Sequence, residues 1–106
     1  MPKFLIEASY TQQGAEGVMS AGGSSRRDAV ASACESVGGT MESFHFAFGD
    51  TDAYVICDLP SNEAATALAL SVNASGGASA KTIVLLTPEE VDAATKQSAD
   101  YRAPGQ

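Results

Sequence analysis

Two kinds of apolar repeat alternate along this chain, and their order restricts the folds open to it. Stretches with the strand-like period of two lie at residues 4–10, 40–48, 52–59 and 81–86. Stretches with a helical period separate the first from the second and the third from the fourth. The order strand, helix, strand, strand, helix, strand predicts an α+β domain with one antiparallel sheet and its helices on a single face.

The first long helix is predicted to run to Val37, with Ser24 or Ser25 as its N-cap. Its apolar stripe repeats with helical spacing, as Val30, Ala33, Cys34 and Val37. Before it, residues 11–20 indicate only a weak helix or turn. Gly38-Gly39 supplies the left-handed stop at the other end.

Two further helices are expected in the second half of the chain. Ser61 caps the first, whose apolar stripe is Ala64, Ala65, Leu68 and Val72. The segment Thr87-Pro88-Glu89-Glu90 has the form of a capping box with proline at the first helical position. It predicts a short helix to about Ser98. We therefore expect a single domain over residues 1–98 and a polar tail over 99–106.

The two middle strands are predicted to form a hairpin. Phe44, Phe46 and Phe48 alternate with Ser43, His45 and Ala47. A loop with an even number of residues places the phenylalanines on one face with Ala53, Val55 and Cys57, and His45 on the other face with Asp52 and Tyr54. A three-residue loop would invert this pairing. We expect the even loop.

This topology is the ferredoxin-like βαββαβ fold with an extra C-terminal helix. Three helices on one face leave the reverse of the four-stranded sheet uncovered. That reverse face takes Ile56, Tyr54 and one parity of the last strand, either Ile83 and Leu85 or Val84 and Leu86. A solvent-facing sheet surface would be more polar, and exposed apolar patches mark interaction surfaces. We therefore expect a homodimer whose sheets face each other.

Charge and composition exclude several classes of partner. The net charge is −7 and the six basic residues are scattered, whereas nucleic-acid binding needs a basic cluster. No apolar run is long enough to span a membrane, and no leader-like segment opens the chain, so we expect a soluble, cytoplasmic protein. Cys34, Cys57 and His45 lack metal-ligand spacing, and the cysteines are expected to be buried.

The candidate site is the sheet face away from the helices. By parity it takes His45, Asp52 and Tyr54, with Ser43 nearby, and Glu7 if Phe4 and Ile6 face the helices. A histidine beside a carboxylate can act as a general base, and tyrosine can donate to a developing oxyanion. The simpler interpretation is a set of hydrogen-bonded cross-strand pairs, with Asp52 as a turn residue.

A second candidate is the helix entry at residues 22–27. Backbone amides at a helix start and the pair Arg26-Arg27 can hold an anion. The spacing matches neither a P-loop nor a dinucleotide fingerprint. A plain helix entry with surface arginines is the alternative, and it is favoured.

Several of these segments together resemble one family. They are residues 1–11 (MPKFLIEASYT), 42–49 (ESFHFAFG), 58–60 (DLP), 68–76 (LALSVNASG) and 85–90 (LLTPEE). They are similar to the GYD-domain family, small bacterial proteins related in fold to the dimeric α+β barrels. The family's Gly-x-Tyr-Asp segment falls on Gly49-Asp50-Thr51-Asp52, where threonine stands at the tyrosine position.

The resemblance implies a homodimeric barrel, and its relatives by fold include cofactor-independent monooxygenases, isomerases, cyclases, haem proteins and ligand-sensing modules. From the residues and the resemblance together we expect a protein that binds a small, partly apolar molecule on the sheet face, without a cofactor. The first alternative is a proton-transfer enzyme with His45 as base, and the second is an interaction module without a ligand. Fold alone does not choose among them.

Overall fold

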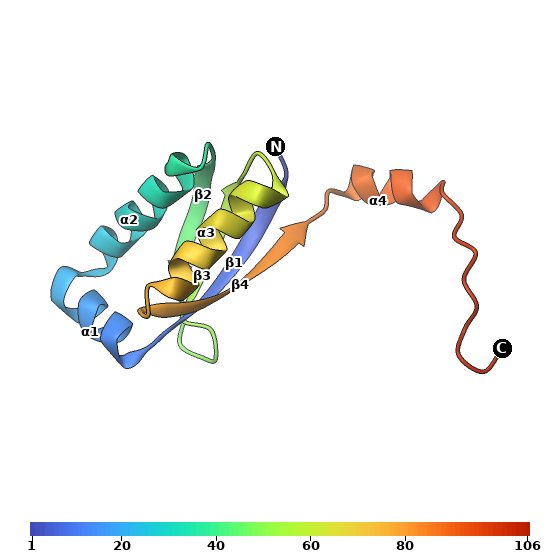
Figure 1. The fold of residues 1–106 in the computed structure, drawn as a ribbon. Helices are drawn as coiled ribbons and strands as arrows, with labels where there is room; N and C mark the ends of the chain where they lie inside the picture. The colour runs from blue at the N-terminus through green and yellow to red at the C-terminus, as the bar shows by residue number, and fades with distance from the viewer.

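The computed structural model describes residues 1–106 and confirms the α+β fold (Figure 1). The elements in chain order are β1 (Lys3–Tyr10), α1 (Gln12–Ala21), α2 (Gly23–Ser36), β2 (Thr40–Phe46), β3 (Ala53–Asp58), α3 (Asn62–Ala74), β4 (Ala78–Leu85) and α4 (Pro88–Thr95). The strands form one four-stranded sheet in the order β2-β3-β1-β4, and every neighbouring pair is antiparallel. Helices α2 and α3 lie side by side over one face of the sheet.

The hairpin register follows the even-loop prediction. Phe44 pairs with Val55, Phe46 with Ala53 and His45 with Tyr54. The connecting residues 47–52 are even in number, so the alternation carries over from one strand to the next. The prediction was wrong for Phe48, because β2 ends at Phe46 and the Phe48 side chain lies in the loop with full exposure.

The core lies between the sheet and the two long helices. The sheet contributes Phe4, Ile6, Val55 and Cys57, and these pack with Cys34 of α2 and with Ala65 and Leu68 of α3. Both predicted helical stripes therefore face the core. The burial of Cys34 and Cys57, expected from their places in these patterns, is confirmed.

The helix starts were predicted correctly except at α2. Ser61 and Thr87 cap α3 and α4 through their hydroxyl oxygens, and Glu90 completes the capping box. Helix α2 starts at Gly23, earlier than predicted, and its N-cap is Gly22 rather than Ser24 or Ser25, so no side chain caps it. Gly22 has a φ of 89°, which glycine adopts freely, and this lets the chain turn from α1 directly into α2.

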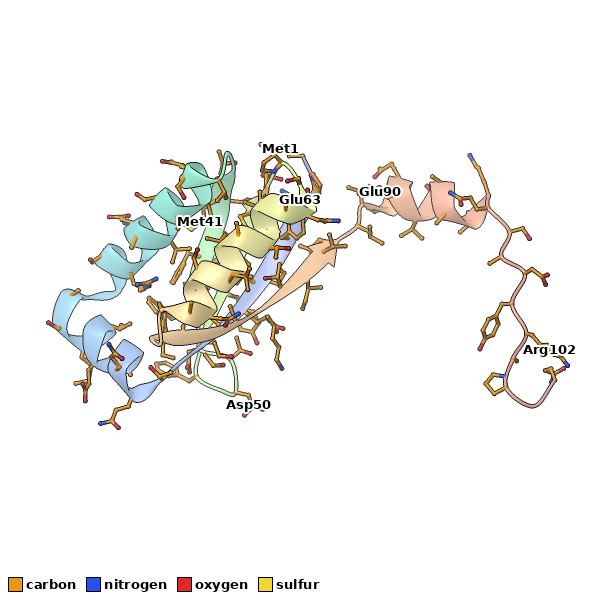
Figure 2. The ribbon with its side chains drawn as sticks, viewed as in Figure 1. Met1, Met41, Asp50, Glu63, Glu90 and Arg102 are labelled. Carbon is orange, nitrogen blue, oxygen red and sulfur yellow. The ribbon has the colours of Figure 1, made fainter.

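The expected cover of the sheet by the C-terminal helix was wrong. Helix α4 continues past the end of β4 and projects away from the body, and none of its residues is buried (Figure 1). Figure 2 shows Glu90 on this arm, to the right of the body that carries Met41 and Glu63. The sheet therefore keeps only the cover of α2 and α3.

Strand β4 also begins earlier than predicted, at Ala78 rather than Lys81. Alanine and serine favour strands weakly, so the sequence pattern misses residues 78–80. These residues nevertheless pair in register with Ala8, Ser9 and Tyr10 of β1. The backbone N–H and C=O groups of β1, which lies between β3 and β4, need partners along the whole strand. Strand β4 therefore continues beyond its apolar part.

Candidate functional site

Four polar side chains line up across the sheet on the face turned away from α2 and α3, here called the outer face. His45 of β2 pairs with Tyr54 of β3, Tyr54 with Glu7 of β1, and Glu7 with Lys81 of β4. Side chains at paired positions point to the same face of an antiparallel sheet. His45, Tyr54, Glu7 and Lys81, here called the polar row, therefore cross all four strands over roughly 14 Å at ~4.8 Å per strand.

An apolar band lies beside the polar row. Leu5 of β1 pairs with Ile56 of β3 and with Ile83 of β4. Leu85 lies two residues further along β4, on the same face as Ile83. Leu5 and Ile56 are half-buried, while the side chain of Ile83 is 42% exposed. The register thereby settles the parity of the last strand, with Ile83 and Leu85 outward. The outer face thus combines an apolar band with a line of ionisable groups.

The polar row has no internal partners within one chain. Its four side chains make no hydrogen bond or ion pair with any protein group. Tyr54 and the ends of the row, His45 and Lys81, are exposed, and Glu7 is half-buried. A half-buried carboxylate without a partner is costly if it becomes fully enclosed. The row is therefore free to bind a ligand or a second chain.

Charges at the far end of the outer face are, by contrast, already paired. The Lys3 ammonium lies 3.1 Å from a carboxylate oxygen of Asp58 and 3.1 Å from one of Glu42. These hydrogen bonds, first to Asp58 and then to Glu42, raise the pKa of Lys3 above its ordinary value. Lys3 and its two carboxylates therefore form a structural charge cluster. Glu7 and Lys81 are unpaired and belong to the polar row, which is the candidate binding site.

Asp52 lies outside the polar row, although alternation had placed it there. It precedes β3, and its carboxylate accepts a hydrogen bond from the Tyr10 backbone N–H at 2.8 Å. Its own N–H donates to the Ala8 carbonyl at 2.9 Å, and the Ser9 hydroxyl donates to the Asp50 carbonyl at 2.9 Å. Asp52 therefore holds the hairpin loop against the end of β1, and the carboxylate expected beside His45 is replaced by the Tyr54 phenol.

Lys81 is the member of the row that sequence reasoning missed. The predicted last strand began at this residue, which made it look like a strand end. The signal was its parity, because Lys81 alternates with Thr82 and so shares a face with Ile83 and Leu85. Once those two residues face outward, Lys81 does as well, directly opposite Glu7.

The helix entry at residues 22–27 borders a separate cleft of about 200 Å³ between α1, α2 and the first residues of β4. Ser25, Arg26 and Tyr10 contribute side chains to its wall, and glycines form much of the rest. Burial raises the pKa of Tyr10 above its usual 10.0, although the nearby Arg26 guanidinium acts in the opposite direction. Arg27 faces elsewhere and pairs with the adjacent Asp28 at 3.2 Å. No polar side chain with unmet bonding needs is buried in this cleft.

The cysteines form no site with other ligands. Cys34 and Cys57 both lie in the core, where the interaction with the Cys34 thiol, together with burial, raises the pKa of Cys57. No group of three histidine, cysteine or acidic side chains is placed to hold a metal ion. None of the helices has the length and apolar character required to cross a bilayer.

Comparison with known families gives one match. The model of the family described as the GYD domain matches residues 4–95, from the first strand to the end of α4. A search of curated proteins finds no match. The matched range contains every residue of the polar row and of the apolar band.

Proposed function

Since the chain belongs to the GYD-domain family, we propose that it acts as a homodimer that encloses a small, partly apolar molecule between two outer sheet faces. The observation that carries this proposal is the apolar band beside an unpartnered polar row. Water is a poor environment for Leu5, Ile56 and Ile83 together, and burying such residues contributes about 25 cal/mol per Å². A second copy offers the same surface in return.

The polar row sets the chemistry of the ligand. Facing rows contribute a histidine, a tyrosine, a carboxylate and an ammonium from each copy. Lys81 suits a carboxylate or enolate oxygen, and the Tyr54 hydroxyl suits a carbonyl. The apolar band suits a ring or short hydrocarbon. A small aromatic or lactone-like molecule with one acidic or carbonyl group fits both parts of the surface.

Thermal stability in the presence of such molecules tests the binding proposal. A ligand that binds only the folded dimer raises the melting temperature by mass action. The expected result is a rise in the wild type that is lost in Lys81→Ala and in Tyr54→Phe. Glu63→Gln, an exposed substitution on α3, is the matched control and is expected to keep the rise. A rise that survives both outer-face substitutions would refute the assignment of the site.

A proton-transfer enzyme is the second candidate, favoured by the direct pairing of His45 with Tyr54. Histidine titrates near neutral pH, so it can take a proton from a carbon next to a carbonyl, while the tyrosine donates to the oxygen. His45→Ala separates the two functions. The enzyme is supported if turnover is lost and binding kept, and refuted if the wild type binds the panel but converts none of it. A dimer that binds no small molecule at all would point to an interaction module.

A further inference from the structure

The core is incompletely filled at the end where α1 lies. A space of about 60 Å³, here called the core chamber, remains between the sheet and helices α2 and α3. Its wall is mostly apolar and includes Ile6, Val55, Val30, Leu68 and Val72. Such a wall offers water no hydrogen-bond partners, and the atoms that line a void lack packing contacts. A small apolar group that entered the core chamber from outside would supply those contacts.

The core chamber adjoins the cleft of about 200 Å³ between α1, α2 and the start of β4. Tyr10, Arg26 and Ala78 border both spaces. Figure 1 shows α1 and the start of β4 together at one end of the body, far from α4. The two spaces therefore form one recess, here called the α1 recess, which has an apolar inner part and a more polar outer part.

Arg26 is the one charged residue on the wall of the α1 recess. It takes part in no ion pair, whereas the neighbouring Arg27 lies 3.2 Å from a carboxylate oxygen of Asp28. No acidic residue borders the recess, although the chain has 13 of them. The guanidinium of Arg26 is thus an uncompensated positive charge at the mouth of an apolar chamber.

Two hydroxyl groups accompany this charge. Burial raises the pKa of Tyr10 and the Arg26 guanidinium opposes that rise, which requires the two side chains to be close. Ser25 borders the outer part of the recess, and neither its hydroxyl nor that of Tyr10 has a hydrogen-bond partner within the chain. The Asp52 carboxylate, which also acts on Tyr10, binds the Tyr10 backbone N–H and does not border the recess. A guanidinium with two free hydroxyl donors suits a carboxylate.

We propose that the α1 recess binds a small monocarboxylate that carries a short branched or aromatic group. The carboxylate pairs with Arg26 and accepts hydrogen bonds from Tyr10 and Ser25, while the apolar group fills the core chamber. From the sequence, a plain helix entry at residues 22–27 was favoured, because the chamber behind Arg26 is built by segments far apart in the chain. The α1 recess lies on the helix side of the sheet and within one chain, so it does not depend on the proposed homodimer.

Methyl NMR of the full-length chain, titrated with phenylacetate, tests this proposal. The methyl groups of Val30 and Val72 border the core chamber, while those of Leu5 and Ile83 belong to the outer face. We expect saturable shifts at Val30 and Val72. Acetate lacks the ring and phenylacetamide lacks the charge, and each is expected to bind at least about tenfold more weakly than phenylacetate.

The two neighbouring arginines supply a matched pair of variants. Arg26→Gln removes the charge from the α1 recess and should weaken phenylacetate binding by about tenfold or more. Arg26 is exposed and makes no ion pair, so this substitution should leave the fold intact. Arg27→Gln removes an equal charge outside the recess and should leave the affinity unchanged.

The outcomes separate the α1 recess from the outer-face site. Phenylacetate that shifts neither Val30 nor Val72 overturns the recess, and so does an equal loss of affinity in the two arginine variants. Shifts confined to Leu5 and Ile83 overturn it as well and support the outer face instead. Shifts at Val30 and Val72 that depend on Arg26, in a chain that sediments as a monomer, uphold the recess and refute the homodimer.

Discussion

Replacing Ile83 by glutamate should split the dimer without unfolding the chain. Ile83 is 42% exposed in the single chain, so its substitution leaves the core intact. Full burial of an isoleucine side chain contributes about 1.5–3 kcal/mol, and the exposed part therefore about 0.6–1.3 kcal/mol per copy. Two copies lose about 1–2.5 kcal/mol. Two carboxylates moved from water into the apolar band add about 1–3 kcal/mol each.

The expected total is about 3–8.5 kcal/mol, which raises the dissociation constant at least about a hundredfold at 1.4 kcal/mol per factor of ten. Sedimentation velocity over a concentration series measures it, and far-UV circular dichroism verifies that the variant is folded. Leu70→Glu, which changes a 64%-exposed side chain on α3, is the matched control and should leave the constant unchanged. A folded Ile83→Glu chain that associates as tightly as the wild type would refute the outer-face dimer.

Three further predictions concern the body of the domain. In α1, Gly17→Ala should stabilise the chain by about 1 kcal/mol, because the added Cβ meets open space. Gly14→Ala should instead destabilise it, because that Cβ overlaps the Gly77 carbonyl. Thermal unfolding measures both changes, and equal effects would contradict the close approach of Gly14 to Gly77. Burial raises the pKa of Tyr10, so above pH 10 the unfolded chain releases this proton first and the free energy of unfolding falls as pH rises. Urea unfolding at pH 9 and 10.5 should show a smaller fall in that free energy for Tyr10→Phe than for the wild type. Cys34 and Cys57 are fully buried, and a thiol reagent should label them only as fast as the chain opens; rapid labelling of the folded chain would disprove this.

Alternation along the strands was enough to predict the hairpin register and most of the outer face. His45 and Tyr54 were placed on one face because side chains in a strand alternate strictly and the even loop carried the phase from β2 to β3, and Glu7 joined them on the condition that Phe4 and Ile6 face the helices. The same rule failed at Asp52, where the strand had not yet begun. There the need to satisfy the Tyr10 amide, rather than the sheet face, decides the orientation of the carboxylate.

The errors at the end of the chain have a different cause. Local signals predicted the start of α4 correctly, since a capping box depends on residues that are neighbours in sequence. They carry no information about what the finished helix packs against. Lys81 was missed for a related reason, because its place in the polar row depends on a pairing with β1 across more than seventy residues.

The central position of β1 also has a consequence for how the chain comes to be folded. Of the four strands this one leaves the ribosome first, yet one of its two neighbours, β4, is the last of the four to be made. Until residues 78–85 emerge, one side of β1 has open hydrogen-bonding groups, as an edge strand does. Pairings so distant along the chain close slowly, so the domain is expected to be exposed to aggregation until β4 has paired with β1.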